Sequence, residues 1–146
     1  MAETDTAAFL SPLSTRSAAE RWLIRLAAAL VSAGAYLLFI PWDTRNRATA
    51  AHPYDETTPV TGLGVTLLAV TLLLLAAYLG HRDHVVWAML LPAVPPAALM
   101  FASFDSHPEQ DSPDLWPLAW AFFTAVIFGA VTIAALLGRT FRATEA

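Results

Sequence analysis

The side chains in this 146-residue sequence that could carry out acid–base or metal chemistry are four histidines and twelve acids. His52 and His107 stand in two separate polar segments, 42–59 and 102–114, and carboxylates lie close to each of them in the sequence. Imidazole and carboxylate groups can hold a divalent cation or act as acid and base. If the two segments meet, they form a joint site, for which the candidate residues are His52, Asp55, Glu56, His107, Glu109 and Asp111.

The alternative, which we favour, is that both polar segments are solvated surface loops without a site. Segment 102–114 contains four acids and no basic residue. Its acids Asp105, Glu109 and Asp111 do not have the spacing of a calcium-binding loop. The acidic composition by itself therefore commits no residue to catalysis.

The other two histidines, His81 and His84, flank Asp83 in a short polar turn. Two imidazoles at i, i+3 spacing with one carboxylate could ligate a metal, but they make an incomplete site. A plain polar turn is the favoured interpretation, because histidine near the C-terminal end of a helix is stabilised by the helix dipole. The sequence has no cysteine and no GxSxG, HExxH or phosphate-binding glycine motif, so we expect no cofactor and lean against an enzyme.

The composition indicates that lipid is the solvent for much of this chain. Hydrophobic residues make up 57% of the sequence and charged residues only 14%, against about a quarter charged in ordinary soluble domains. The net charge of −4 excludes the basic surface of a nucleic-acid-binding protein. All basic residues are arginine, a coding bias typical of GC-rich genomes, and we expect a bacterial protein.

Four apolar stretches predict an all-α integral membrane protein, a four-helix bundle. About 20 residues of helix cross a hydrocarbon core of roughly 30 Å. The expected membrane-spanning segments are about 22–41, 60–80, 84–102 and 115–137. They form one transmembrane domain, 18–138, between a disordered tail at 1–17 and a short tail at 139–146. Continuous apolar runs exclude barrel strands, which alternate over roughly 10 residues.

Local motifs predict where these helices begin and end. Ser17 and Glu20 have the spacing of a capping box at the start of the first helix, and Pro41 should end that helix. We expect Gly80 and Gly138 to close the second and fourth helices, because glycine is common just after a helix C-terminus. The fourth helix is expected to be capped by Ser112 or Asp114.

The distribution of arginine predicts that both termini are cytoplasmic and that the protein lies in the cell (inner) membrane. In this orientation six of the eight arginines are inside, as the positive-inside rule requires. Arg25, near the start of the first apolar stretch, is expected to extend its guanidinium outward to the membrane edge. A long signal peptide cleaved after the sequence Ala48-Thr49-Ala50 is a disfavoured alternative.

The third apolar stretch contains Pro92, Pro95 and Pro96, which predict a kinked helix because each proline removes a backbone donor. One interpretation is a broken helix that offers backbone groups to a substrate. The favoured one is a structural kink satisfied by neighbouring Ser and Thr hydroxyls. The central parts of all four stretches lack ionisable side chains, which argues against proton pumps and ion-coupled carriers.

Small residues follow one another at four-residue spacing in the fourth apolar stretch, which predicts close helix packing. Either these rows pack within the bundle, or one of them docks a membrane partner or a second copy of the chain. A large side chain at Gly129 is expected to disturb whichever contact is made. The two rows consist of Ala121, Ala125, Gly129 and of Ala130, Ala134, Gly138.

These patterns favour a small multi-pass membrane protein that acts as a non-enzymatic accessory or assembly subunit beside a membrane partner. The alternative is a membrane enzyme that acts on a lipophilic substrate at the outer interface through the loop histidines and carboxylates. A third possibility is a small exporter or resistance protein for an apolar compound. The bilayer is the expected partner in every case, and nucleic acid in none.

Overall fold

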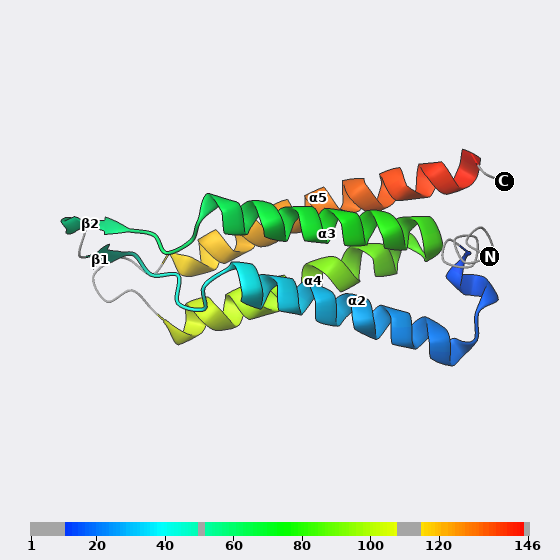
Figure 1. The fold of residues 1–146 in the computed structure, drawn as a ribbon, viewed down its shortest axis with the longest axis horizontal. Coiled ribbons are helices and arrows are strands. Elements are labelled where there is room, and N and C mark those ends of the chain that lie inside the picture. The colour runs from blue at the N-terminus through cyan, green and yellow to red at the C-terminus, as the bar shows by residue number, and fades with distance from the viewer. Residues whose placement is uncertain (1–10, 50–51, 108–114, 145–146) are drawn as a thin grey trace, which may run out of the picture.

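The computed structural model describes residues 11–49, 52–107 and 115–144. Four long helices are joined by short connections, and the first connection carries a small hairpin (Figure 1). In chain order the elements are η1 (Leu13–Thr15), α2 (Ala18–Phe39), β1 (Arg47–Thr49), β2 (His52–Thr57), α3 (Gly62–Arg82), α4 (Val85–Ser106) and α5 (Trp116–Thr144).

All four helices are long and apolar enough to cross a membrane, so the chain is a multi-pass membrane protein of four helices. Large apolar side chains cover their outer surfaces; Leu38, for example, is 76% exposed and Leu118 is 69% exposed. Such a surface is unfavourable in water and favourable in hydrocarbon. The four predicted spanning segments are thereby found as helices.

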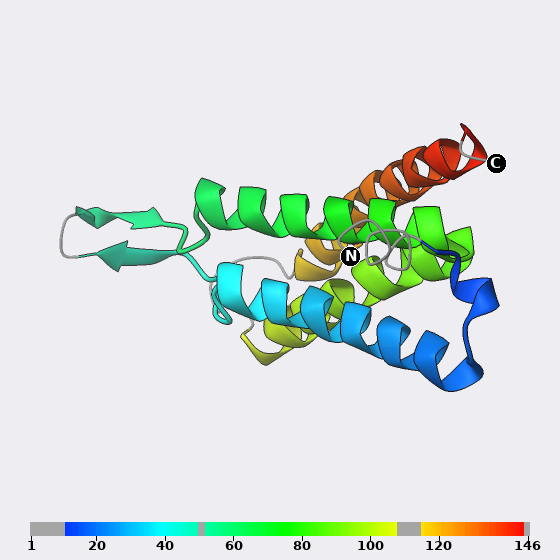
Figure 2. The same ribbon diagram turned by 45° about the vertical axis from the view of Figure 1, so that its right-hand side comes forward.

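The helices pack as a bundle in which α3 and α4 each contact all three others, while α2 and α5 occupy opposite corners. Figures 1 and 2 show η1 and the end of α5 at one end of the bundle and the β1–β2 hairpin at the other. We call these the termini end and the hairpin end. The core between the helices consists mostly of Ala, Leu and Val side chains.

The helix starts follow the local motifs of the sequence. Ser17 accepts a hydrogen bond from the Glu20 backbone N–H, and the Glu20 carboxylate accepts one from the Ser17 N–H, so the predicted capping box is present. Thr61 caps α3 by accepting from the Gly64 N–H at 3.1 Å. Helix α2 ends at Phe39, just before Pro41, as predicted. The proposed caps of α5 at 112 and 114 lie outside the described residues.

Two glycines that were expected to end helices are instead inside them. Helix α3 continues past Gly80 to Arg82, and α5 continues past Gly138 to Thr144. Neither glycine has a positive φ, so neither serves as a left-handed cap. Both glycines lie where the backbones of α3 and α5 are in contact, so a side chain is excluded by helix packing and not by a helix end.

Glycine holds α3 and α5 in contact near the termini end. A Cβ added at Gly80 would lie 2.1 Å from the Ala135 carbonyl oxygen, and one added at Gly138 would lie 2.1 Å from that of Ala77. Helices approach this closely only where small residues face each other. In the row Ala130, Ala134, Gly138, the last residue therefore lies at this contact, and Ala134 is buried beside it, whereas Ala130 lines a cavity described below. At Gly129, in the other row, an added Cβ would meet nothing within 4 Å.

At the hairpin end, α3 rests against α2 instead. A Cβ added at Gly64 would lie 2.3 Å from the Phe39 carbonyl oxygen. Helix α3 thus touches α2 at its start and α5 at its end. Helix α3 therefore crosses from one neighbour to the other, and Figures 1 and 2 show α3 and α5 crossing each other.

One of the carbonyls that the prolines of α4 leave without a backbone donor is satisfied by a hydroxyl of another helix. Pro96 has no N–H to donate to the carbonyl of Pro92, one turn earlier. Ser32 of α2, which is fully buried, donates to that carbonyl at 2.7 Å. Helix α4 runs through all three prolines, from Val85 to Ser106.

The connection between α2 and α3 forms a two-stranded antiparallel hairpin that the all-α prediction did not include. Arg47 pairs with Thr57 and Ala48 with Glu56, after which the register shifts and Thr49 pairs with His52. Pro53 has no N–H for the ladder, which is consistent with the irregular register beside it. The strands project from the bundle (Figure 1).

A buried ion pair joins α2 to the turn between α3 and α4 at the termini end. The Arg25 guanidinium donates two hydrogen bonds to the Asp83 carboxylate, at 2.7 and 2.8 Å. It packs against the rings of Trp22 and Trp87, at 5.2 and 4.5 Å from their centroids, and these two rings contact each other edge to face. Arg25 is therefore buried against an acid and two indoles, rather than extended into solvent as predicted.

The charge of Asp83 is maintained by its hydrogen bonds. Burial alone would raise the pKa of Asp83, but the hydrogen bonds from Arg25 and from the His84 backbone N–H lower it below its usual value. Asp83 is thus ionised at neutral pH. Nearby, Arg82 donates to the carbonyl of Ser11 at 2.9 Å, and Leu13 of η1 is fully buried. Ser11 and Leu13 belong to the predicted 1–17 tail, of which the structure describes residues 11–17.

Candidate functional site

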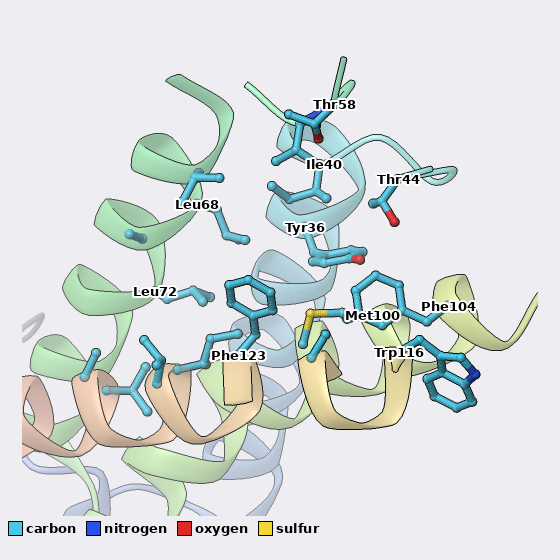
Figure 3. A pocket seen from close by; sticks show the side chains of 18 of the residues that line it. Tyr36, Ile40, Thr44, Thr58, Leu68, Leu72, Met100, Phe104, Trp116 and Phe123 are labelled. Atoms are coloured by element: carbon cyan, nitrogen blue, oxygen red, sulfur yellow. The ribbon is translucent and has the colours of Figure 1, made fainter. Parts of the chain in front are cut away.

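A cavity of about 730 Å³ lies inside the hairpin half of the bundle (Figure 3). Its volume is in the range of small-molecule binding sites, roughly 300–1,000 Å³. All four helices contribute apolar side chains to its wall, and the connection before α3 contributes polar ones. The residues labelled in Figure 3 are Tyr36, Ile40, Thr44, Thr58, Leu68, Leu72, Met100, Phe104, Trp116 and Phe123.

The cavity exists where α3 and α5 diverge. Its lining on α5 runs from Leu115 to Val131, and close packing of α5 against α3 begins just beyond, at Ala135 and Gly138. Four large lining residues of α3 and α5 are also exposed on the outer surface and mark the open side of the cavity. They are Val65 (48% exposed), Leu73 (37%), Phe123 (49%) and Val126 (52%). The cavity therefore opens sideways, on a surface that faces lipid.

One polar group is buried in the apolar wall. Tyr36, in the last turns of α2, is only 3% exposed and lines the cavity. Its hydroxyl is within reach of the Ser103 hydroxyl, without the full geometry of a hydrogen bond. A ligand atom that accepts a hydrogen bond from Tyr36 would satisfy this buried group.

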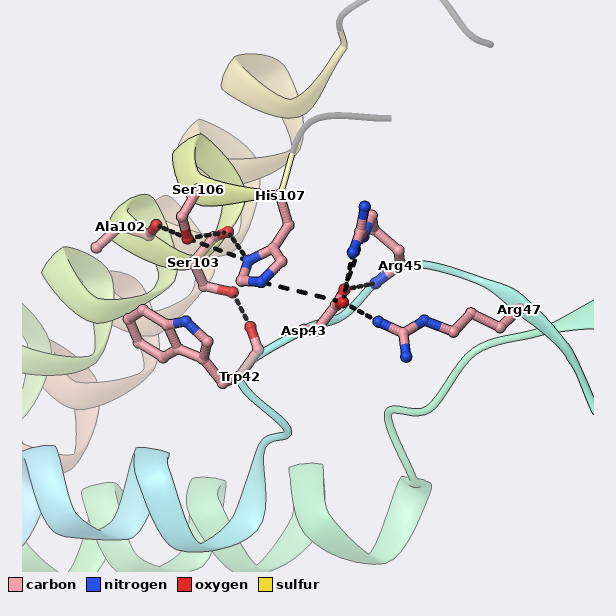
Figure 4. A network of polar contacts seen from close by, with 8 residues as sticks. All are labelled: Trp42, Asp43, Arg45, Arg47, Ala102, Ser103, Ser106 and His107. Atoms are coloured by element: carbon pink, nitrogen blue, oxygen red, sulfur yellow. Dashed lines mark hydrogen bonds and ion pairs between the residues drawn. The ribbon is translucent and has the colours of Figure 1, made fainter. Parts of the chain in front are cut away.

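Charged residues gather at the mouth of the cavity in a group that we call the Asp43 cluster: Asp43, Arg45, Arg47 and His107 (Figure 4). Arg45 donates to both carboxylate oxygens of Asp43, at 2.9 and 2.7 Å, and Arg47 donates to one of them. Of these four residues, Arg45 and His107 line the cavity. With two guanidiniums around one carboxylate, the cluster has a net positive charge.

His107 is held by the end of α4. Its Nδ1 lies 3.0 Å from the Ser103 carbonyl oxygen, which can only accept, so this nitrogen carries the proton. Its Nε2 then lies 4.0 Å from Asp43, too far for a hydrogen bond. The ring is thus fixed in one orientation between α4 and the Asp43 cluster, with Nε2 free to meet a ligand or a proton.

The structure separates the residues that were predicted to form a joint site. His52 lies in β2 next to the turn of the projecting hairpin, whereas His107 lies at the surface of the bundle. Asp55 and Glu56 are exposed on β2. Glu109 and Asp111 lie outside the described residues. Of the six candidates, His107 alone is seen to line the cavity.

Sequence reasoning missed Asp43 and Arg45 as site residues. The available signal was the spacing Asp-x-Arg-x-Arg, which begins two residues after Pro41. In a tight turn, an acid can bind arginines that follow it two and four residues later. Composition alone indicates only a charged loop here. The meeting of this turn with His107 depends on the packing of α4 against α2 and has no local signature.

At the termini end, the turn with His81, Asp83 and His84 has a structural role. Asp83 is committed to Arg25, and its carboxylate also accepts from the His84 backbone. Within residues 11–49, 52–107 and 115–144, no group of three or more His, Asp or Glu side chains is placed to hold a metal ion.

The cavity and the Asp43 cluster together can accommodate an amphiphile. The apolar wall would enclose a hydrocarbon portion, and the mouth offers hydrogen-bond donors and positive charge to a polar end. Proton transfer at this place would have to use His107, whose Nε2 faces Asp43. No protein-family model, no curated protein and no solved structure matches the chain.

Proposed function

We propose that this small multi-pass membrane protein binds a lipophilic molecule in the cavity between α3 and α5. The observation that carries this proposal is the cavity itself: about 730 Å³, apolar, and open toward lipid. Well-packed helix bundles leave few voids larger than a water molecule, so a cavity of this size calls for an occupant. The function is binding or transfer of the lipophile, without chemistry on it.

Two functions considered from the sequence also involve a lipophilic molecule: a membrane enzyme at the outer interface and an exporter of an apolar compound. The role proposed here differs from the first in that the site lies inside the bundle and not between the loops. The arginine distribution supports placing the hairpin end outside and both termini in the cytoplasm. In this orientation the cavity would draw its ligand from the outer leaflet. His107 remains the residue on which an enzymatic version of the proposal would depend.

Filling the cavity should abolish binding. Ala119→Phe places a ring in the cavity, because Ala119 lines it, whereas Ala121 is exposed on the same helix and does not. We expect a photoactivatable fatty alcohol, added to the purified protein in phosphatidylcholine nanodiscs, to label cavity residues of the wild type. Labelling should fall at least fivefold in Ala119→Phe and remain within a factor of two in Ala121→Phe. Equal labelling of both variants would contradict the proposed site.

The orientation has its own test. Reporter fusions after Gly138 and within the hairpin turn at residue 51 should report opposite sides of the membrane, with Gly138 cytoplasmic. Six of the eight arginines then lie inside. Reports from the same side would indicate an even number of crossings between the fusion points and would contradict the four-span arrangement.

A second candidate function, an accessory subunit beside a membrane partner, is favoured by one observation. The row Ala121, Ala125, Gly129 is exposed, and nothing within the described chain covers it at Gly129. Such a row allows a helix of another protein to approach closely. A stoichiometric partner that is lost on Gly129→Leu, while lipophile labelling persists, would support this role.

A further inference from the structure

We propose that the ligand of this cavity is an anionic single-chain amphiphile, with its carboxylate or phosphate headgroup held by Arg45. The inference rests on the proposed lipophile binding and specifies which class of lipophile the site prefers. The juxtaposition that carries it is an apolar cavity with a guanidinium in its lining: among the described residues, Arg45 lines it and no carboxylate does.

Arg45 retains donors for a headgroup. A guanidinium has five N–H groups in a planar fork. Arg45 uses two of them on the Asp43 carboxylate. Asp43 also receives Arg47, so its negative charge is shared between two cations. The remaining donors of Arg45 belong to a side chain that is anchored, only partly exposed and located at the cavity wall, and such pre-organised donors bind carboxylate and phosphate well.

Three neutral donors lie on the same side. Tyr36 is in the last turns of α2, which brings its buried hydroxyl into the half of the cavity nearest the Asp43 cluster. Thr44 and Thr58 line the mouth (Figure 3). An oxyanion that enters here meets hydrogen-bond donors from several directions, whereas a cationic headgroup would meet Arg45 at close range.

The shape of the cavity favours a single extended chain. The lining on α5 extends from Leu115 to Val131, which at 1.5 Å per residue corresponds to about 24 Å along the helix. Apart from Tyr36, the lining from Leu68 and Leu72 to Ile127 and Val131 is apolar. A long-chain acyl group would run along α5 from its headgroup at the mouth toward the α3–α5 contact.

The test compares three photoactivatable probes with the same chain: a fatty acid, a lysophosphatidate and a fatty alcohol. Each is added to the full-length protein in phosphatidylcholine nanodiscs, and labelled peptides are identified by mass spectrometry. We expect the acid or the lysophosphatidate to label the cavity at least tenfold more strongly than the alcohol. The better of the two identifies the headgroup. Labelling by the alcohol as strong as that by both anions would overturn the inference and leave the proposed function intact. If no probe labels the cavity, the proposed function itself fails.

The matched variants are Arg45→Gln and Arg139→Gln, which remove the same charge. Arg139 is exposed on α5, directly after Gly138 at the α3–α5 contact, and it does not line the cavity. Labelling by the preferred anion should fall about tenfold or more in Arg45→Gln, as expected for losing hydrogen bonds to a charged group, and stay unchanged in Arg139→Gln. Unchanged alcohol labelling in Arg45→Gln shows that the cavity is still formed. Equal anion labelling of both variants would overturn the role of Arg45.

Discussion

Replacing Asp83 with Asn is expected to lower the free energy of unfolding by about 3–5 kcal/mol, because it leaves a buried guanidinium without its counter-charge. Arg25 is only 9% exposed, and Asp83 receives both of its hydrogen bonds. The two adjacent indole rings packed against Arg25 help to shield it from water. Thermal or denaturant unfolding of the purified protein in mild detergent measures the loss.

The control for Asp83→Asn removes both charges together. The double variant Arg25→Met with Asp83→Leu should recover most of the lost stability, since an apolar pair of similar volume often replaces a buried ion pair at little cost. The pair also has a pH signature. The pKa of Asp83 is lowered on folding, so its stabilisation is complete above the unfolded value near 3.8 and is lost as the pH falls through the lower folded value. Wild-type stability in Asp83→Asn at neutral pH would contradict this account.

Replacing Gly138 with Leu should separate α3 from α5 and destabilise the bundle by about 3 kcal/mol or more, at the upper end of overpacking effects. The Cβ alone would lie 2.1 Å from the Ala77 carbonyl oxygen and 2.9 Å from its Cα, so backbone has to move. The rest of the leucine side chain adds to this clash. The expected result is a lower unfolding temperature in detergent and a wider α3–α5 distance by cross-linking.

Gly129→Leu is the matched comparison for Gly138→Leu, on the same helix and with the same substitution. Gly129 is exposed, and an added Cβ there meets nothing within 4 Å. We expect its effect on unfolding in detergent to be within about 0.5 kcal/mol, as for ordinary surface substitutions. If Gly138→Leu were tolerated as well as Gly129→Leu, the close contact of α3 and α5 would be refuted.

Features that depend on one stretch of sequence could be predicted from it. The four helices follow from the mean hydropathy of segments of about 20 residues, which a single polar residue or proline changes little. The capping box at Ser17 and Glu20 and the end of α2 before Pro41 involve only neighbours in the chain. The small residues of α5 indicated close packing correctly, since Ala134 and Gly138 are buried, but not which row packs inward.

Features that depend on two distant stretches could not be predicted in this way. Gly80 has the local signature of a helix end, and only the position of Ala135 opposite it shows that it is a packing residue. Arg25 and Asp83 are 58 residues apart, so their pairing requires knowing that α2 lies beside the α3–α4 turn. The same holds for His107, whose neighbour is Asp43 rather than His52. The cavity depends on how α3 crosses between its neighbours, which three glycine contacts decide.

The sideways opening between α3 and α5 determines which concentration governs occupancy. A molecule that enters from the hydrocarbon phase is in equilibrium with its mole fraction in one leaflet, not with its aqueous concentration. A long-chain compound that is nearly insoluble in water can therefore saturate the site, provided that it is abundant in that leaflet. Affinities measured in detergent will shift with the micelle concentration, whereas those expressed as ligand-to-lipid ratio in nanodiscs should be constant over a range of lipid amounts.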